Sequence, residues 1–193
     1  NDILDYSKIE AGKMQMTPEE FKIRDTIKTL MASFKTAINA HKVKLHYSVS
    51  PEVPEILIAD HVRIRQILYN LVGNAIKFTE KGNITLDLRY LKDIDADRVM
   101  LECTIADTGI GIPGDIGDKL FEPFTQIESP RRKKIQGTGL GLSIVKLLVM
   151  QMNGTVQLQR NEADGTTVTF TLIAGKGKSP NLPEPPTVPT PLL

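Results

Sequence analysis

Several stretches of this chain alternate strictly between apolar and polar residues. The alternation runs through VKLHYSV (43–49), NITLDLRYL (83–91) and RVMLECTIAD (98–107), and it predicts strands that bury one face. A charged loop joins the last two into an expected hairpin, and the NEADG turn joins VQLQR and TTVTFTL into another. We expect a third hairpin from residues 43–49 and 55–60, which the PEVPE turn connects.

Helical spacing of apolar residues marks the segments between these strands. Residues 67–79 (ILYNLVGNAIKFT) carry one apolar stripe, which predicts a helix that begins after an N-cap at Asp60. Further helices are predicted from an N-cap at Asp25 through Ile38 and over residues 143–152. The order of elements predicts an α+β fold, a two-layer α/β sandwich with helices on one face of a mixed, mostly antiparallel sheet.

The composition excludes several classes of protein. The 193 residues carry a net charge of +1, so no electrostatic footprint indicates binding to nucleic acid or to a membrane surface. The single cysteine, Cys103, excludes an internal disulfide and a Cys-rich metal site, and its place in an alternating strand predicts a core thiol. No apolar run reaches the roughly 18 residues of a membrane span. The chain begins without Met, and we interpret it as a fragment of a longer protein.

Residues 108–142 break the regular pattern. They contain seven Gly, three Pro and the basic run Arg131–Lys134, with few periodic apolar positions. A long irregular stretch inside a compact domain is typical of a functional lid or of a disordered insert. The composition changes again after residue 175, because six of the last fifteen residues are Pro. Residues 176–193 are therefore predicted to be a disordered, polyproline-like linker.

The polar side of the 67–79 helix has an unusual composition. Asn70, Asn74 and Lys77 fall together there, with Gly73 beside them. Asn and Gly both lower helix propensity, so an ordinary solvated face would carry Glu, Lys or Gln instead. Together with the glycine clusters that follow later in the chain, the two amides favour a binding role for this face.

Two glycine clusters flank the irregular stretch. ADTGIGIP (106–113) follows a strand, and QGTGLGLSIVK (136–146) opens a helix, where unpaired backbone N–H groups attract anions. Gly137, Gly139 and Gly141 therefore suit a polyphosphate. GTGLGL follows no strand, which excludes a dinucleotide-binding motif, and neither cluster contains the Gly-Lys-Ser/Thr of a P-loop. Glycines that only form loops remain the alternative.

Asp107 ends an apolar strand directly before Thr-Gly-Ile-Gly. A carboxylate at such a position is expected to be partly buried, and burial without a hydrogen-bond donor costs free energy. The amino group of a purine ring would supply that donor. The alternative is an aspartate that only starts the turn before glycine.

Five motifs together resemble the ATP-binding catalytic domain of histidine protein kinases, in the superfamily shared with gyrases, heat-shock chaperone ATPases and mismatch-repair ATPases. RIRQILYNLVGNAIKFT is similar to the N box, DTGIGIP to the first Gly box, LFEPFTQ to the F box, GTGLGL to the second Gly box and DGTTVTF to the last one. They occur in family order over residues 1–173. The resemblance implies a Bergerat-type fold that binds ATP and Mg²⁺.

The resemblance also assigns roles to residues. It implies that Asn74 ligates Mg²⁺, that Asp107 accepts from the adenine amino group and that Lys77 reaches toward phosphate. Phe121 and Phe124 are implied to anchor the lid, from which Arg132 or Lys133 contacts the γ-phosphate. Neutral amide oxygens suit Mg²⁺, which takes its remaining ligands from water and phosphate. The full set implied to bind nucleotide is Asn70, Asn74, Lys77, Phe78, Asp107, Gly109, Gly111, Ile112, Phe124, Arg132, Lys133, Gly137, Thr138, Gly139, Leu140, Gly141 and Thr167.

Position 70 separates two activities within this superfamily. The resemblance implies a Glu there in the hydrolysing relatives, one helical turn before the metal-binding Asn. Asn70 cannot accept a proton near neutral pH, and neither can Gln66 one turn earlier. This difference favours phosphoryl transfer to a side chain over hydrolysis of ATP.

The histidine that receives phosphate in this family is followed by Glu or Asp and lies on a dimerising helical hairpin. None of His41, His46 and His61 is followed by an acidic residue, and we interpret all three as surface or core-edge side chains. Residues 1–16 resemble the end of the second hairpin helix, and residues 17–175 resemble the catalytic domain. We therefore expect this chain to bind ATP without phosphorylating itself.

The resemblance implies several partners. They are ATP, the acceptor hairpin of the parent kinase in cis or in trans, and a receiver domain or response regulator, to which Pro-rich linkers lead in hybrid kinases. We expect a monomeric fragment of a homodimeric parent, placed in the cytoplasm. Two alternatives stay open: a nucleotide-sensing or interaction domain that has lost transfer, and a self-contained ATPase.

Overall fold

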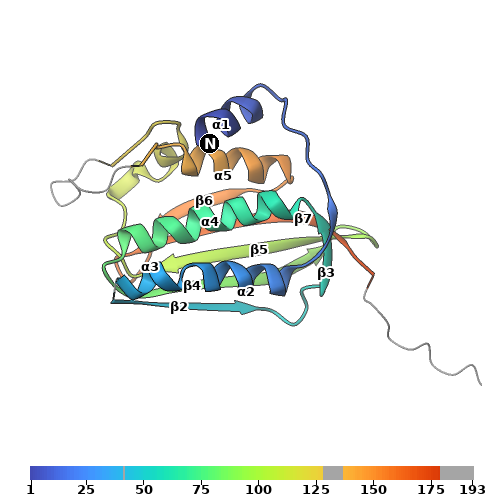
Figure 1. Cartoon of the computed structure of the whole chain (residues 1–193), viewed down its shortest axis with the longest axis horizontal. Coiled ribbons are helices and arrows are strands. Elements are labelled where there is room, and N and C mark those ends of the chain that lie inside the picture. The colour runs from blue at the N-terminus through green and yellow to red at the C-terminus, as the bar shows by residue number, and fades with distance from the viewer. Residues whose placement is uncertain (41, 128–136, 179–193) are drawn as a thin grey trace, which may run out of the picture.

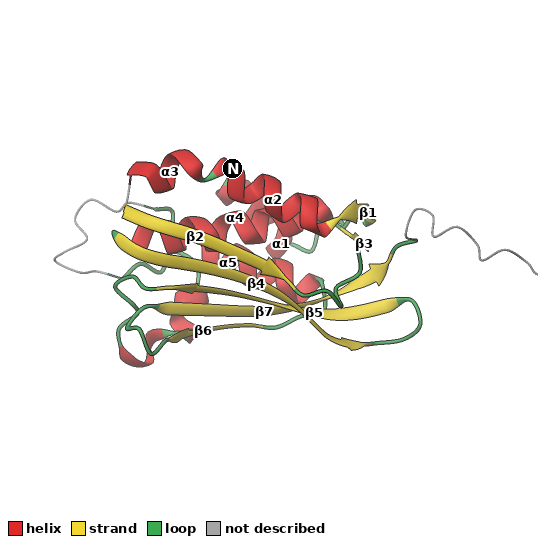
Figure 2. Ribbon diagram, turned by 90° about the horizontal axis from the view of Figure 1, so that it is seen from below, coloured by secondary structure: helices red, strands yellow, loops and turns green. Residues whose placement is uncertain are grey.

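A mixed sheet forms one layer of the protein, and the α-helices form a second layer on one of its faces (Figure 1 and Figure 2). The computed structural model describes residues 1–40, 42–127 and 137–178. The strands are β1 (Glu19–Lys22), β2 (Lys42–Val49), β3 (Ile56–Ala59), β4 (Lys81–Asp93), β5 (Arg98–Asp107), β6 (Val156–Arg160) and β7 (Thr166–Lys176). The helices are α1 (Asp2–Glu10), α2 (Ile23–Ser33), α3 (Lys35–Ala40), α4 (His61–Phe78) and α5 (Gly141–Gln151), with 3₁₀ turns η1 (Gly114–Ile116) and η2 (Asp118–Phe121). The predicted two-layer α+β architecture is confirmed.

The order of the strands explains why the sheet is mixed. It runs β1-β3-β7-β5-β4-β2, and β6 pairs with β7. The predicted hairpins β4–β5 and β6–β7 are confirmed. The predicted hairpin of residues 43–49 and 55–60 is wrong. β2 instead pairs in parallel with β4, while β3 pairs with β1 and β7 on the other side of the sheet.

Alternating strand residues and the apolar stripe of α4 meet in the core. In β5, Val99, Leu101, Cys103 and Ile105 are all buried. Burial also raises the pKa of the Cys103 thiol, so this cysteine is a core residue, as predicted. The buried residues of α4 are Ile64, Ile67, Leu68, Leu71, Val72, Ala75 and Ile76. Because this stripe faces the core, the amides of α4 lie on another side of the helix.

The second predicted helix is divided in two. α2 begins at Ile23 with Lys22 at its N-cap, so the predicted cap at Asp25 is wrong. Asp25 lies in the first turn, where its negative charge interacts favourably with the helix dipole. α2 ends at Ser33 and α3 begins at Lys35. Within the described ranges, no helix combines the length and the apolar character needed to cross a membrane.

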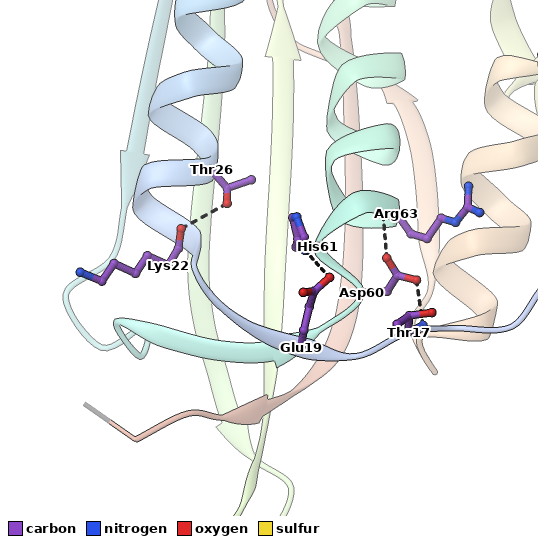
Figure 3. Close-up of polar contacts among 7 residues, drawn as sticks. All are labelled: Thr17, Glu19, Lys22, Thr26, Asp60, His61 and Arg63. Atoms are coloured by element: carbon purple, nitrogen blue, oxygen red, sulfur yellow. Dashed lines mark hydrogen bonds and ion pairs between the residues drawn. The ribbon is translucent and has the colours of Figure 1, made fainter. Parts of the chain in front are cut away.

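The start of α4 is tied to the segment that leads in from α1 (Figure 3). Oδ1 of Asp60 accepts from the backbone N of Arg63 at 3.1 Å, which confirms the predicted cap, and Oδ2 accepts from the N of Thr17 at 3.0 Å. Nδ1 of His61 lies 3.1 Å from Oε1 of Glu19, close enough for an ion pair when the imidazole is protonated. These contacts fix one end of the helix whose other half carries Asn70 and Asn74.

Helix α1 lies beside α5 (Figure 1). Oδ2 of Asp5 accepts from Nε2 of Gln66 at 3.1 Å, and Nη1 of Arg63 donates to Oε1 of Gln66 at 2.9 Å. Oδ2 of Asp2 accepts from Oγ1 of Thr138 at 3.2 Å. Two carboxylates about one turn apart thus link α1 both to α4 and to the loop before α5.

Candidate functional site

A cavity of about 970 Å³ lies between α4 and the loops that contain the two glycine clusters. Residues of β5 and β7 close it on the sheet side. Its lining residues are Asp2, Asn70, Leu71, Asn74, Ala75, Lys77, Phe78, Ile105, Asp107, Gly111, Ile112, Leu120, Thr125, Gln126, Ile127, Gly137, Thr138, Gly139, Gly141, Leu142, Leu158, Thr166 and Val168. Segments that are far apart in the sequence therefore contribute to one site.

The polar side of α4 forms one wall of the cavity. Nδ2 of Asn70 lies 3.5 Å from the carbonyl oxygen of Gly141, to which it donates at the limit of hydrogen-bond distance. No described residue hydrogen-bonds the carboxamide of Asn74, which lines the cavity one turn later. Lys77 places Nζ beside Gly137, where an added Cβ would lie 2.8 Å from it. The unusual amides thus face a cavity that also contains a cationic group.

Asp107 lies at the end of β5 with 7% of its surface exposed. Its Oδ1 accepts from the backbone N of Gly109 at 2.9 Å and from the N of Thr166 at 3.1 Å. Burial raises the pKa of this carboxyl above its ordinary value, while the two N–H donors act in the opposite direction. None of the described residues donates to Oδ2. Asp107 therefore lines the cavity with one carboxylate oxygen held and the other available to a ligand.

The first glycine cluster is held against the turn before β7. Gly111 adopts a φ of +70°, and a Cβ there would collide with the carbonyl oxygen of Asp164. The N of Ile110 donates to the carbonyl oxygen of Phe78 at 3.2 Å, which joins the cluster to the end of α4. Gly111 is therefore required both for its backbone conformation and for close packing.

The second glycine cluster leads into α5. Gly139 has a φ of +73°, and its carbonyl oxygen accepts from the N of Phe124 at 2.9 Å. A Cβ at Gly139 would lie 2.9 Å from the Cα of Phe124. No side chain caps the start of α5, which begins at Gly141 on the wall of the cavity. Its first N–H groups are therefore open to an anion.

The two phenylalanines of the FEPF segment differ. Phe121 is only 5% exposed and packs below Lys146, whose Nζ lies 5.8 Å from the ring centroid. Phe124 is 67% exposed and does not line the cavity. Phe121 is therefore the phenylalanine whose side chain packs into the protein. Phe124 contributes its backbone, through the hydrogen bond to Gly139.

Most of the predicted nucleotide-binding residues come together in this cavity. Those that line it are Asn70, Asn74, Lys77, Phe78, Asp107, Gly111, Ile112, Gly137, Thr138, Gly139 and Gly141. Gly109, Phe124, Leu140 and Thr167 do not line it, although Gly109 donates to Asp107. Arg132 and Lys133 lie outside the described residues.

Thr166 lines the cavity in place of Thr167. Side chains alternate across a strand, so Thr166 and Val168 share the face of β7 that turns toward the cavity. Thr167 points to the other face, where its Oγ1 accepts from Nδ2 of Asn161 at 3.2 Å. The DGTTVTF motif identified the right segment, and only the strand register distinguishes the two threonines.

Sequence reasoning missed two further residues at this site. Asp2 lines the cavity from α1, and no local pattern in the sequence connects it with residues so far along the chain. Asn161 supports Asp107 from the NEADG turn, where its Nδ2 donates to the carbonyl oxygen of Asp107 at 2.8 Å. Asn is so common at the start of a turn that its position in the NEADG motif indicates no more than a turn role.

Residues 59–175 match the family described as histidine kinase-, DNA gyrase B- and HSP90-like ATPase. The autoinducer 2 sensor kinase/phosphatase LuxQ of Vibrio harveyi is 41% identical over 174 residues, which cover 89% of this chain and 20% of that protein. The signal transduction histidine-protein kinase BarA of Escherichia coli K12 is 38% identical over 88% of this chain and 18% of its own length. The chain thus spans about a fifth of these relatives.

Solved structures agree with these sequence relatives. Full-length ShkA in complex with AMPPNP superposes with a TM-score of 0.77 at 28% identity, over 93% of this chain and 36% of ShkA. The catalytic domain of the histidine kinase ThkA, in a nucleotide-free form, gives a TM-score of 0.65 at 28% identity, over 84% of this chain and 97% of that domain.

Proposed function

The chain belongs to the family of histidine kinase-, DNA gyrase B- and HSP90-like ATPases, and we propose that it presents the γ-phosphate of Mg-ATP to a histidine on a helical hairpin. The relatives named above are sensor kinases, and the structural neighbours include histidine kinase catalytic domains. One observation carries the proposal: a single cavity brings together Asp107, the amides of α4, Lys77 and both glycine loops.

The sheet side of the cavity suits an adenine ring. Oδ2 of Asp107 is available to accept from the exocyclic amino group, while Ile105, Ile112 and Val168 supply apolar surface for the ring. ShkA, a structural neighbour, forms a complex with AMPPNP, an ATP analogue. Both observations support ATP as the ligand.

The side of the cavity formed by α4 and the start of α5 suits a triphosphate. Lys77 and the uncapped start of α5 supply positive charge and backbone donors there, beside Gly137, Gly139 and Gly141. In the described residues, no group of three or more His, Cys, Asp or Glu side chains could hold a metal. A metal here would depend on amide and phosphate oxygens, and Asn74 and Asn70 fit that requirement for Mg²⁺. Bound Mg²⁺ would neutralise negative charge on the phosphates.

We infer phosphoryl transfer rather than ATP hydrolysis from the residues of α4 that line the cavity. Asn70 stands one turn before Asn74, and a carboxamide cannot take a proton from water near neutral pH. An incoming imidazole nitrogen needs no such base to attack phosphorus. It would form the new P–N bond as the bond between the γ-phosphorus and ADP breaks.

The domain assignments extend this proposal. We assign residues 1–16, with α1, to the end of the acceptor hairpin, residues 17–175 to the catalytic domain and residues 176–193 to a linker, of which 179–193 lie outside the described residues. The proposed partners are the hairpin of the parent kinase and a receiver domain or response regulator, in a homodimeric parent. The buried thiol of Cys103, without a disulfide, favours the cytoplasm.

Transfer to a separately supplied acceptor hairpin tests the proposal. With labelled ATP and Mg²⁺, we expect label on the hairpin histidine, none on this chain alone, and very slow phosphate release without the hairpin. ATP binding without any transfer would favour a nucleotide-sensing module. Steady phosphate release without an acceptor would favour a self-contained ATPase.

A further inference from the structure

The side chain of Asn161 makes four hydrogen bonds at the turn between β6 and β7. Its Oδ1 accepts from the backbone N of Ala163 at 3.1 Å and from the N of Gly165 at 3.0 Å. Its Nδ2 donates to the carbonyl oxygen of Asp107 at 2.8 Å and to Oγ1 of Thr167 at 3.2 Å. One half of the amide therefore holds the turn, and the other half holds the end of β5.

The same turn leads into one of the two donors that orient the Asp107 carboxylate. Thr166 follows Gly165 directly, and its N–H is one of the two donors to Oδ1. Asn161 thus fixes the main chain of Asp107 through one contact and positions a donor to its side chain through another. Asn161 does not itself line the cavity, so it acts on a ligand through the residues that it positions, among them Asp107.

We propose that Asn161 is a positioning residue that determines the selectivity of this site for adenine over purines with a carbonyl oxygen at position 6. The inference rests on the proposed function and extends it to the choice of base. A carboxylate held in one orientation accepts a hydrogen bond from an amino group at that position. The same fixed carboxylate repels a carbonyl oxygen, because both atoms present lone pairs.

A carboxylate that is free to turn changes the affinity for adenine nucleotides and for hypoxanthine nucleotides differently. An adenine nucleotide loses a well-aligned, charge-assisted hydrogen bond, which corresponds to roughly tenfold in affinity. A hypoxanthine nucleotide loses only a repulsive contact, because the carboxylate can turn away. Selectivity for adenine therefore falls, even though the residues proposed to bind the triphosphate are unchanged.

The test compares ADP with IDP by titration calorimetry with the complete chain; the two bases carry an amino group and a carbonyl oxygen at position 6, and hypoxanthine also carries a proton at N1. Asn161→Asp is the informative variant, because its carboxylate oxygen still accepts from Ala163 and Gly165 while the donor to Asp107 is lost. We expect about tenfold weaker ADP binding and IDP binding within about twofold of the unmodified chain. Asn161→Ala is expected to give the same loss of selectivity. Glu162→Gln, an exposed change in the same turn, should leave both affinities unchanged.

The possible results distinguish the positioning role of Asn161 from the proposed function. If Asn161→Asp keeps its selectivity for ADP, or loses the same factor of affinity for ADP and for IDP, the positioning role is overturned. ATP binding by the chain would not be affected by that result. A chain that binds neither nucleotide would overturn the proposed function and this inference with it. Thermal unfolding of each variant identifies any loss that comes from the fold, and Asn161→Asp is chosen to keep the turn closed even if Asn161→Ala does not fold.

Discussion

Burial of the Asp107 carboxylate lowers the stability of the fold, and the same carboxylate lines the candidate binding site. Its carboxylate is 7% exposed, and only Oδ1 is satisfied by described residues. Burial of a charged carboxylate costs free energy even when one of its oxygens is hydrogen-bonded. Functional groups that bind ligands often carry a cost of this kind, since the partner that satisfies them is the ligand.

Asp107→Asn is expected to stabilise the empty chain at pH 7 and to weaken ADP binding by about tenfold or more. Burial raises the pKa of the carboxyl in the folded chain, so the unmodified chain loses stability as pH rises from its ordinary value of 3.8 through the raised value. The advantage of Asn should therefore be complete above the raised pKa and vanish below pH 3.8. Urea unfolding across this range measures it, with Asp97→Asn as an exposed control.

Asn74→Ala tests the metal assignment. If the amide oxygen of Asn74 ligates Mg²⁺, its removal should reduce the gain in ATP-analogue affinity on adding Mg²⁺ by about tenfold and leave Mg²⁺-free binding unchanged. Titration of AMPPNP with Mg²⁺ and with EDTA gives that ratio. Asn39→Ala, at an exposed position of α3, is the matched control. An unaltered Mg²⁺ effect in Asn74→Ala would place the metal elsewhere.

At the scale of elements, α1 depends on its contacts. It is nine residues long, and a helix of this length is marginal in isolation. Gln66→Ala removes the amide that Asp5 accepts from, without changing the sequence of α1. We expect exchange of the α1 backbone amides to accelerate by about tenfold, measured by hydrogen exchange. Arg65→Ala, an exposed change on α4, should leave the exchange of these amides unchanged. Equal protection of the α1 amides in both variants would contradict the docking of α1 through Gln66.

Two glycines provide a matched pair for the loop before α5. Gly139→Ala places a Cβ at a φ of +73° and 2.9 Å from the Cα of Phe124, so we expect a shifted loop and about tenfold weaker AMPPNP binding. Gly73→Ala lies within α4, and apart from its chain neighbours and the backbone of its own helix no heavy atom lies within 4 Å of the new Cβ, so the change should stabilise the chain by about 1 kcal/mol. Nucleotide titration and urea unfolding measure the two effects. Normal binding by Gly139→Ala would show that the loop geometry is not needed.

Periodicity predicts elements more readily than their pairing. The alternation in β4 and β5 and the stripe of α4 are local, so the sequence determines them directly. The partner of β2 is β4, which lies beyond α4 in the chain, and the local PEVPE turn wrongly suggested β3. The helix start at Ile23 was also missed, because Asp25 resembles a cap although it lies inside the first turn.

At the scale of the whole molecule, the site exists only where distant segments meet. Motifs identified α4 and both glycine loops, because their residue types are unusual for a solvated helix or an ordinary turn. Thr166, Asp2 and Asn161 could not be assigned from the sequence. Their roles depend on strand register, on the docking of α1 and on a turn that reaches back to β5.

Calorimetric titration of the complete chain with AMPPNP at saturating Mg²⁺ tests directly whether this cavity binds the nucleotide. We expect one nucleotide bound per chain, in the cavity between α4 and the glycine loops, and severe loss of that binding in Asp107→Ala. A chain that gives no binding, or an Asp107→Ala variant that binds as tightly as the unmodified chain, would contradict this expectation.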